Sequence, residues 1–260
     1  MRRFLILPLL VAATPVLAGR DYCPDRPGFT TPACTVDPGR VSAELSAADW
    51  AIDRADGDRT DEVLVGDLLV RAGIGDTTEV RLGWTAFGRQ RERMAGSVTA
   101  DNGVGDVSLG IKQNLRNPDG SGLATAALVE VQVPTGGSAI GAGDWGARLL
   151  VPASADLSDA VAFAITPELD AEPDADRRGR HLRFGSAAGL AFDLSDALNV
   201  QTEMLWLRDN DPVNHHTEVQ GGVFLAGKMG ADWQLDAGGA VGLNRDTPDL
   251  QWIVGVARRF

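Results

Sequence analysis

Residues 233–244, WQLDAGGAVGLN, indicate the fold because their side chains alternate between apolar and polar or small. Leu235 and Val241 share one face with the opening tryptophan, whereas Asp236 falls on the other face. Strict alternation over about ten residues is typical of a β-strand that has one apolar and one polar face. These residues therefore predict a strand that separates an apolar environment from a polar one.

The same alternation recurs along most of the chain. In residues 198–206, Val200 and Met204 oppose Gln201 and Glu203. Such segments predict about twelve strands, and an even number of strands about ten residues long is typical of a transmembrane antiparallel up-and-down β-barrel. The predicted fold class is therefore all-β. The predicted strands are 41–52, 62–74, 78–87, 104–115, 124–134, 146–157, 160–171, 181–194, 197–208, 216–229, 232–244 and 250–260.

The predicted connections alternate in length. The turns at Gly75–Thr77 and Ser195–Asp196 are tight, whereas the connections at Phe87–Gly103 and Thr135–Trp145 are long. Short periplasmic turns and long external loops are the pattern of outer-membrane barrels. Because proline removes a donor from the ladder, Pro152 inside a predicted strand requires either a bulge or a different strand boundary.

The N-terminus predicts export. Arg2 and Arg3 precede a short apolar run that ends in small residues, so residues 1–18 are predicted to be a secretory signal peptide. The run is too short for a membrane anchor. Residues 19–40 are then expected to form a periplasmic segment, too short for a large plug, ahead of a barrel over residues 41–260.

The two cysteines follow the expected cleavage position closely. Cys23 and Cys34 are eleven residues apart. In an oxidising periplasm a pair at this spacing is predicted to form a disulfide. No further ligand lies near them in the sequence, so no metal is expected there.

The composition and motifs disfavour several functions. The formal net charge of −12 at pH 7 argues against nucleic acid as a partner. Residues 141–146 match G-x-G-x-x-G, but a strand rather than a helix is predicted after them, so they are interpreted as a glycine-rich loop. No nucleophile motif is found, so no enzyme activity and no cofactor are predicted. His215 and His216 lie in a predicted outer loop near Asp209, where a metal site and a solvated loop both stay open, and no metal is assigned.

The polar faces of the predicted strands point into the barrel. They carry charges of both signs, which water or opposite charges must offset. Two interpretations stay open: a polar pathway for solutes, or a set of ion pairs that fills the lumen. The lumen-lining candidates are Asp67, Arg71, Glu79, Arg81, Lys112, Glu130, Arg148, Glu168, Arg183, Glu203 and Asp236.

Four stretches resemble a family of bacterial outer-membrane transporters. They are VGDVSLGIK at residues 104–112, VPTG at 133–136, GAGDW at 141–145 and LNRDTPD at 243–249. The family is labelled as the putative MetA pathway of phenol degradation, and the resemblance covers roughly residues 60–260. The resemblance implies a barrel and the uptake of small compounds, aromatic ones among them.

The predicted function is passive uptake of small organic or aromatic solutes through a channel in the outer membrane of a Gram-negative bacterium. One alternative is an outer-membrane enzyme acting on lipid, with His181 or His215 beside a serine and an acid. The others are a sealed barrel whose outer loops bind a partner or ligand, and a soluble periplasmic β-sandwich. Expected partners are outer-membrane lipid and lipopolysaccharide, a small-molecule solute, and the barrel-assembly machinery, whose recognition signal the terminal Phe260 resembles.

Overall fold

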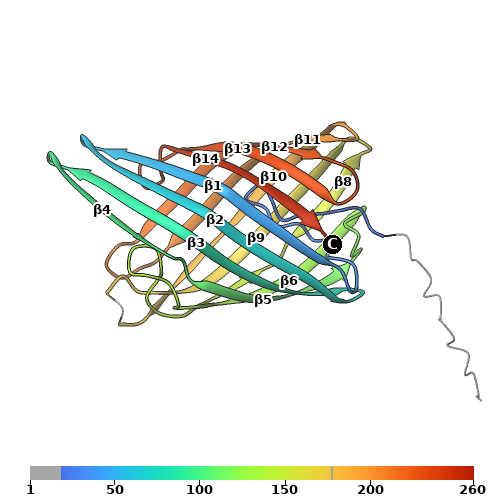
Figure 1. The fold of residues 1–260 in the computed structure, drawn as a ribbon, viewed down its shortest axis with the longest axis horizontal. Coiled ribbons are helices and arrows are strands. Elements are labelled where there is room, and N and C mark those ends of the chain that lie inside the picture. Colours follow the sequence, from blue (N-terminus) through green and yellow to red (C-terminus); the bar gives the residue numbers. More distant parts are fainter. Residues whose placement is uncertain (1–18, 177) are drawn as a thin grey trace, which may run out of the picture.

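The computed structural model describes residues 19–176 and 178–260, and the predicted signal peptide lies outside them. The described chain forms one antiparallel sheet that closes where β1 pairs with β14 (Figure 1). The predicted all-β barrel is confirmed. Its strands are β1 Val41–Ala55, β2 Asp58–Gly75, β3 Thr78–Met94, β4 Ser97–Gly103, β5 Val107–Arg116, β6 Leu123–Val133, β7 Gly146–Leu150, β8 Ala153–Ser158, β9 Val161–Pro173, β10 Arg180–Ser195, β11 Leu198–Asp209, β12 His216–Lys228, β13 Trp233–Gly242 and β14 Leu250–Arg259.

The fourteen strands occupy twelve positions around the barrel. Strands β4 and β5 follow one another along β3, and β7 and β8 follow one another along β9. Pro152 lies in the gap between β7 and β8, and its carbonyl accepts a hydrogen bond of 2.9 Å from the Ala126 amide. The single strand predicted at 146–157 is therefore two strands, and the missing amide hydrogen of Pro152 explains the interruption.

The prediction of a long loop at Phe87–Gly103 is wrong. Strand β3 continues to Met94 and turns into β4, which pairs back along it from Ser97↔Met94 to Gly103↔Gly88 (Figure 1). Residues 89–94 read RQRERM, and β4 is exposed on both faces over most of its length. A hairpin with water on both sides does not need the apolar–polar alternation from which strands were predicted.

The barrel is apolar outside and polar inside. Arg71, Glu79 and Lys112 point inward and are fully buried. Among the residues that the structure describes, no helix is both long and apolar enough to cross a membrane. The faces predicted from alternation are those observed. The exposed outward side chains include Leu109, Ile111, Val129, Met204, Val223, Leu225, Leu235, Val241, Trp252 and Val254.

The two ends of the barrel differ. Short turns, such as the one between β10 and β11, gather at the end where the chain terminates, and the β3–β4 hairpin marks the opposite, long-loop end (Figure 1). At the short-turn end, the Arg258 guanidinium carbon lies 4.5 Å from the Trp233 ring centroid and 4.4 Å from that of Phe260. These cation–π contacts explain how a charged residue fits beside the terminal aromatic residue on the outer face.

Residues 19–40 do not form a separate periplasmic segment. They enter the barrel from the short-turn end and leave it where the Gly39 amide donates to the Gly73 carbonyl at 2.8 Å. Ala33 and Cys34 are each only 1% exposed inside it. The expected segment is therefore corrected to a small plug, named here the luminal segment. Its irregular backbone lacks the alternation from which the barrel was predicted.

Candidate functional site

The inner wall near the short-turn end carries a buried cluster of charges. Arg71 on β2 contacts Glu79 on β3 and Glu44 on β1, each with an N–O distance of 2.9 Å. The Lys112 ammonium on β5 lies 3.2 Å from Glu79. All four side chains are fully buried. Alternation along four neighbouring strands places them on the same face, so sequence pattern alone brings their charges together.

The luminal segment adds Asp25 to this cluster. The Asp25 carboxylate lies 3.5 Å from both Arg71 and Lys112, and it also pairs with Arg81. Burial opposes the charged form, but Arg81, Lys112 and Arg71 outweigh it and hold the pKa of the Asp25 carboxyl below its usual range. Asp25 is therefore a carboxylate that joins the segment to three strands of the wall.

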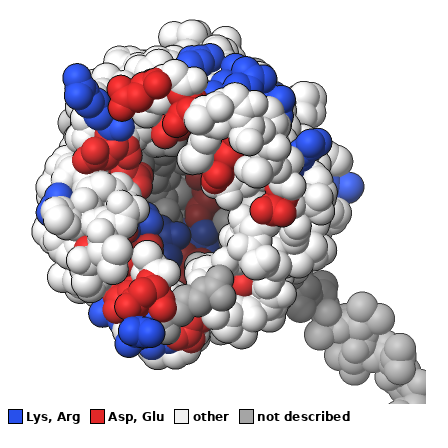
Figure 2. Space-filling view, turned by 90° about the vertical axis from the view of Figure 1, so that its left-hand side faces the viewer, with Lys and Arg blue, Asp and Glu red and all other residues white. Residues whose placement is uncertain are grey.

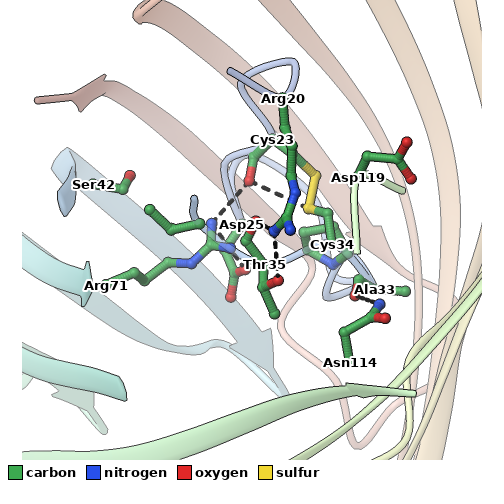
Figure 3. Close-up of a disulfide and its surroundings, with 12 residues drawn as sticks. Arg20, Cys23, Asp25, Ala33, Cys34, Thr35, Ser42, Arg71, Asn114 and Asp119 are labelled. Atoms are coloured by element: carbon green, nitrogen blue, oxygen red, sulfur yellow. Dashed lines mark hydrogen bonds and ion pairs between the residues drawn. A yellow bond between two sulfur atoms is a disulfide. The ribbon is translucent and has the colours of Figure 1, made fainter. Parts of the chain in front are cut away.

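The wall charges also satisfy the backbone of the luminal segment. Arg71 donates a 2.9 Å hydrogen bond to the Cys23 carbonyl (Figure 3). The Val36 amide donates to Glu79 at 2.8 Å. An irregular segment inside a barrel needs such partners because its amides and carbonyls pair with no strand. The ion-pair cluster therefore has a second role as the binding site for the segment.

The opposite wall holds the segment through two more carboxylates. Arg26 donates a 2.9 Å hydrogen bond to Asp236 on β13, whose side chain is fully buried. Glu203 on β11 accepts a 2.6 Å hydrogen bond from the Thr30 hydroxyl and one from the Thr30 amide at 3.0 Å. The segment thus spans the lumen from β1–β5 to β11–β13.

An aromatic contact completes this attachment. Phe29 packs edge-on against Phe224 of β12, with ring centroids 5.2 Å apart. A Cβ atom at Gly238 would lie 2.2 Å from the Phe224 ring. Gly238 therefore makes the room in which Phe224 can turn toward the segment.

The predicted disulfide between Cys23 and Cys34 is present, with the two Cα atoms 6.6 Å apart (Figure 3). It closes a loop that contains Asp25, Arg26 and Thr30, three of the residues that contact the wall. Closing a loop of this length stabilises by at most about 3 kcal/mol in the chain-entropy description. The bond therefore restricts the segment to conformations in which its contacts with both walls form together.

Space remains beside the luminal segment. A cavity of about 220 Å³ lies between Phe29 and the wall formed by Glu44, Asp49 and Asp67. A second cavity of about 300 Å³ is lined by Asp67, Glu130, Arg148 and other residues. Asp67 borders both, so the cavities adjoin. Figure 2 looks into the long-loop end and shows the molecule hollowed there, with acidic and basic side chains in its depth.

The charges nearer the long-loop end form a looser group. Arg148 lies 3.0 Å from Glu168 and 3.5 Å from Asp170, while Arg183 lies 2.7 Å from Glu172. The Arg148 side chain is 42% exposed, in contrast to the fully buried Arg71. The Arg148 side chain beside the second cavity therefore faces open space, although its partners Glu168 and Asp170 are 9% and 0% exposed. The charges beside the luminal segment are covered by it.

The structure places all eleven predicted lumen-lining residues on the inner wall, in two groups. Arg71, Glu79, Arg81, Lys112, Glu203 and Asp236 contact the luminal segment or the buried ion-pair cluster, whereas Asp67, Glu130, Arg148, Glu168 and Arg183 lie beside the cavities or in the looser group. Sequence reasoning missed Glu44, although Ser42 and Ser46 flank it on the same polar face. It also missed Asp25 and Arg26, for which no periodic signal exists.

The fold is that of outer-membrane porins. The structure is similar to the KdgM porin, with a TM-score of 0.52, 11% sequence identity, and coverage of 84% of this chain and 99% of that chain. It is similar to the NanC porin, with a TM-score of 0.53, 9% identity, and coverage of 84% and 98%. It is also similar to the translocator domain of the autotransporter NalP from Neisseria meningitidis, with a TM-score of 0.50 and 15% identity. That similarity covers 85% of this chain and 88% of the other chain. At these identities the similarities concern the fold alone.

Sequence comparison adds the family. No curated protein matches the chain. The family described as "Putative MetA-pathway of phenol degradation" matches residues 24–260, which include the barrel and most of the luminal segment. The stretches at residues 104–112 and 243–249 that suggested this family lie within the match. The chain therefore belongs to this family.

Proposed function

We propose that the protein is a passive channel for small organic solutes in the outer membrane of a Gram-negative bacterium. The observation that carries this proposal is the pair of adjoining cavities beside the luminal segment, which share Asp67. The apolar outer face suits a lipid environment, and the polar inner face suits water. The short-turn end is then periplasmic, and the luminal segment lies at the exit of the channel.

The expected solutes are small. Cavities of about 220 and 300 Å³ suit compounds of the size of a single ring or a monosaccharide. The family description names phenol degradation, which favours aromatic compounds among them. Charges of both signs line the second cavity: Glu130 and Arg148, which are cross-strand neighbours on β6 and β7, and Asp67. They favour solutes that carry a polar or charged group over purely apolar ones.

The proposed partners follow from the same arrangement. Lipid and lipopolysaccharide would surround the barrel, and the terminal Phe260, which is exposed on the outer face, would be recognised by the barrel-assembly machinery. The alternative of an enzyme acting on lipid required a serine beside His181 or His215. Within the described residues, the close polar contacts of the His181 ring are the carboxylates of Asp174, Asp209 and Asp211. This favours a channel over an enzyme.

Solute entry into liposomes tests the proposal. The protein would be reconstituted and challenged at pH 7 with arabinose, 4-hydroxybenzoate and raffinose, with protein-free liposomes as reference. We expect the first two to enter and the trisaccharide to enter much more slowly. Asp67→Trp, which fills the junction of the cavities, should slow entry, whereas Val223→Trp on the outer face should not. Entry no faster than through protein-free liposomes would contradict the proposal.

A further inference from the structure

A second cluster of titratable side chains lies at the long-loop end, apart from the cavities. Its centre is His181 at the start of β10, which pairs across the sheet with Glu172 on β9. The His181 Nδ1 atom lies 3.1 Å from an Asp174 oxygen, and Nε2 lies 3.1 Å from an Asp209 oxygen. Asp211 lies 3.5 Å from Nδ1. Three neighbouring strands and the loops that join them thus converge on one imidazole.

The imidazole is buried, and only one of its two ring nitrogens has a hydrogen-bond partner among the described residues. The His181 side chain is 6% exposed. Nδ1 is hydrogen-bonded to Asp174, whereas Nε2 is buried and, among the described residues, has no partner in hydrogen-bonding geometry. A carboxylate on one ring nitrogen fixes the tautomer and orients the other nitrogen, as is general for histidines that bind metals. The Nε2 lone pair is therefore available. One ligand atom from each of Glu172, His181 and Asp209 lies within 4.8 Å of the other two.

The charges around the imidazole do not balance. Four carboxylates, those of Glu172, Asp174, Asp209 and Asp211, lie within one cluster. Over residues 19–176 and 178–260, Arg183 is the one arginine or lysine within ion-pair distance of any of them, at 2.7 Å from Glu172. Like charges gathered in a buried site oppose ionisation unless a cation meets them. A divalent ion would offset this repulsion.

The two ring nitrogens are not equivalent as ligands. On the Nδ1 side, Asp211 already accepts backbone hydrogen bonds of 2.7 Å from Ala175, Val213 and Asn214, which occupy both of its oxygens. On the Nε2 side, one oxygen of Glu172 is bonded to Arg183, and Asp209 Oδ1 accepts the Asp211 amide at 2.7 Å. Among the described residues, the second oxygen of each of these two carboxylates has no such bond. The available ligand atoms are therefore those around Nε2.

We propose that Glu172, His181 and Asp209 bind one divalent transition-metal ion of the zinc class, with Asp174 as the positioning residue that orients His181. Imidazole with carboxylates suits zinc, nickel and copper, whereas oxygen ligands alone suit calcium and magnesium. Three protein ligands leave a fourth position for water. The ion would tie the loops at 174–179 and 210–215 to the ends of β9–β11. The site differs from the histidine pair singled out in the sequence: His216 Nε2 lies 3.0 Å from Glu218 instead.

Equilibrium dialysis with metal analysis tests the proposal. The full-length folded protein in detergent would be freed of metal with EDTA and titrated with Zn²⁺, and folding of every variant would be checked by heat-modifiable gel migration. We expect one Zn²⁺ per chain. His181→Gln and Asp209→Asn should each weaken binding at least tenfold, and Asp174→Asn by about 10- to 100-fold. His216→Gln is the matched control at the same long-loop end, and it should bind Zn²⁺ as the wild type does.

Hydrogen exchange gives a readout that does not depend on transport. Zn²⁺ should slow exchange in the loops at 174–179 and 210–215 of the wild type but not of His181→Gln. Absence of stoichiometric Zn²⁺ binding to the wild type, or equal binding by His181→Gln, would overturn the proposal. Ca²⁺ binding with equal affinity that survives His181→Gln would also overturn it, because it would show an acidic cation-binding surface without an imidazole ligand.

Discussion

Arg26 and Asp236, which lie 210 residues apart in the sequence, form an ion pair of 2.9 Å inside the barrel. The Asp236 side chain is fully buried, and that of Arg26 is 14% exposed. One residue belongs to the luminal segment and the other to β13, so the pair fastens the plug to the wall.

The first prediction concerns this pair. Removing one partner of a buried ion pair costs about 3–5 kcal/mol because the other charge is left unpaired. Asp236→Asn and Arg26→Gln should therefore each raise the hydrogen-exchange rates of residues 24–36. The double variant should lose less free energy of unfolding than the two single variants lose in sum. Arg54 and Asp249, 3.6 Å apart and 53% and 44% exposed, provide the control. Asp249→Asn should cost about 0–1 kcal/mol. Strict additivity of Arg26→Gln and Asp236→Asn would argue against the pairing.

The second prediction concerns the place where the luminal segment joins β1. A Cβ atom at Gly73 would lie 2.2 Å from the Asp37 carbonyl oxygen, a backbone atom that cannot move alone. Gly73→Ala should therefore destabilise the docked segment by about 1–3 kcal/mol. At Gly75 the nearest atom would be 3.9 Å away, so Gly75→Ala should have little effect. Exchange rates of the Thr35 and Val36 amides measure both changes. Equal effects of the two substitutions would place the segment elsewhere.

The third prediction concerns pH. Because the pKa of the Asp25 carboxyl is lowered in the folded state by Arg81, Lys112 and Arg71 against the effect of burial, its contribution to stability is present above the unfolded value of about 4. That contribution is lost as the pH falls below about 4 toward the folded value. The difference in unfolding free energy between the wild type and Asp25→Asn should therefore be constant from about pH 8 to 5 and shrink in stronger acid. A difference that grows on acidification would refute this assignment.

The fourth prediction concerns the outer face. Val223 lies near the middle of β12, is 53% exposed and pairs with Gly239 and Thr202 on the neighbouring strands. Val223→Arg should cost about 2–4 kcal/mol in a bilayer, because a charge is forced into hydrocarbon. Leu198 lies at the short-turn end of β11 and is also outward, so Leu198→Arg should cost about 0–1 kcal/mol. Urea titrations in liposomes would measure both. The reverse order would mean that the faces are misassigned.

Alternation predicted the barrel well because each strand lies between lipid and a polar lumen. The faces of β11 and β13 follow from the sequence for that reason. The β3–β4 hairpin escaped prediction because both of its faces meet water. The inward charges differ along the wall: Arg71 and Lys112 are paired and fully buried, whereas the Arg148 side chain is 42% exposed beside a cavity. The first group matches the interpretation of ion pairs that fill the lumen, and the polar pathway stays a proposal.

The luminal segment could not be predicted from the same pattern. Its contacts join Asp25, Arg26 and Thr30 to strands up to 210 residues away, and no local periodicity encodes them. The inward charges did signal that partners were needed, since isolated buried charges are costly. They did not show that those partners would come from residues 19–40. The convergence of Glu172, His181 and Asp209 likewise depends on how three strands end at the same level.

If the barrel is a channel, the luminal segment should narrow it. Single-channel conductance in planar bilayers tests it most directly, with the wild type compared with a variant that lacks residues 19–36 and with Arg26→Gln/Asp236→Asn, both checked for folding by heat-modifiable migration. We expect a small, steady conductance for the wild type, a several-fold larger one for the deletion variant, and intermediate or fluctuating values for the double substitution. Equal conductance of wild type and deletion variant, or no conductance from the wild type, would contradict it.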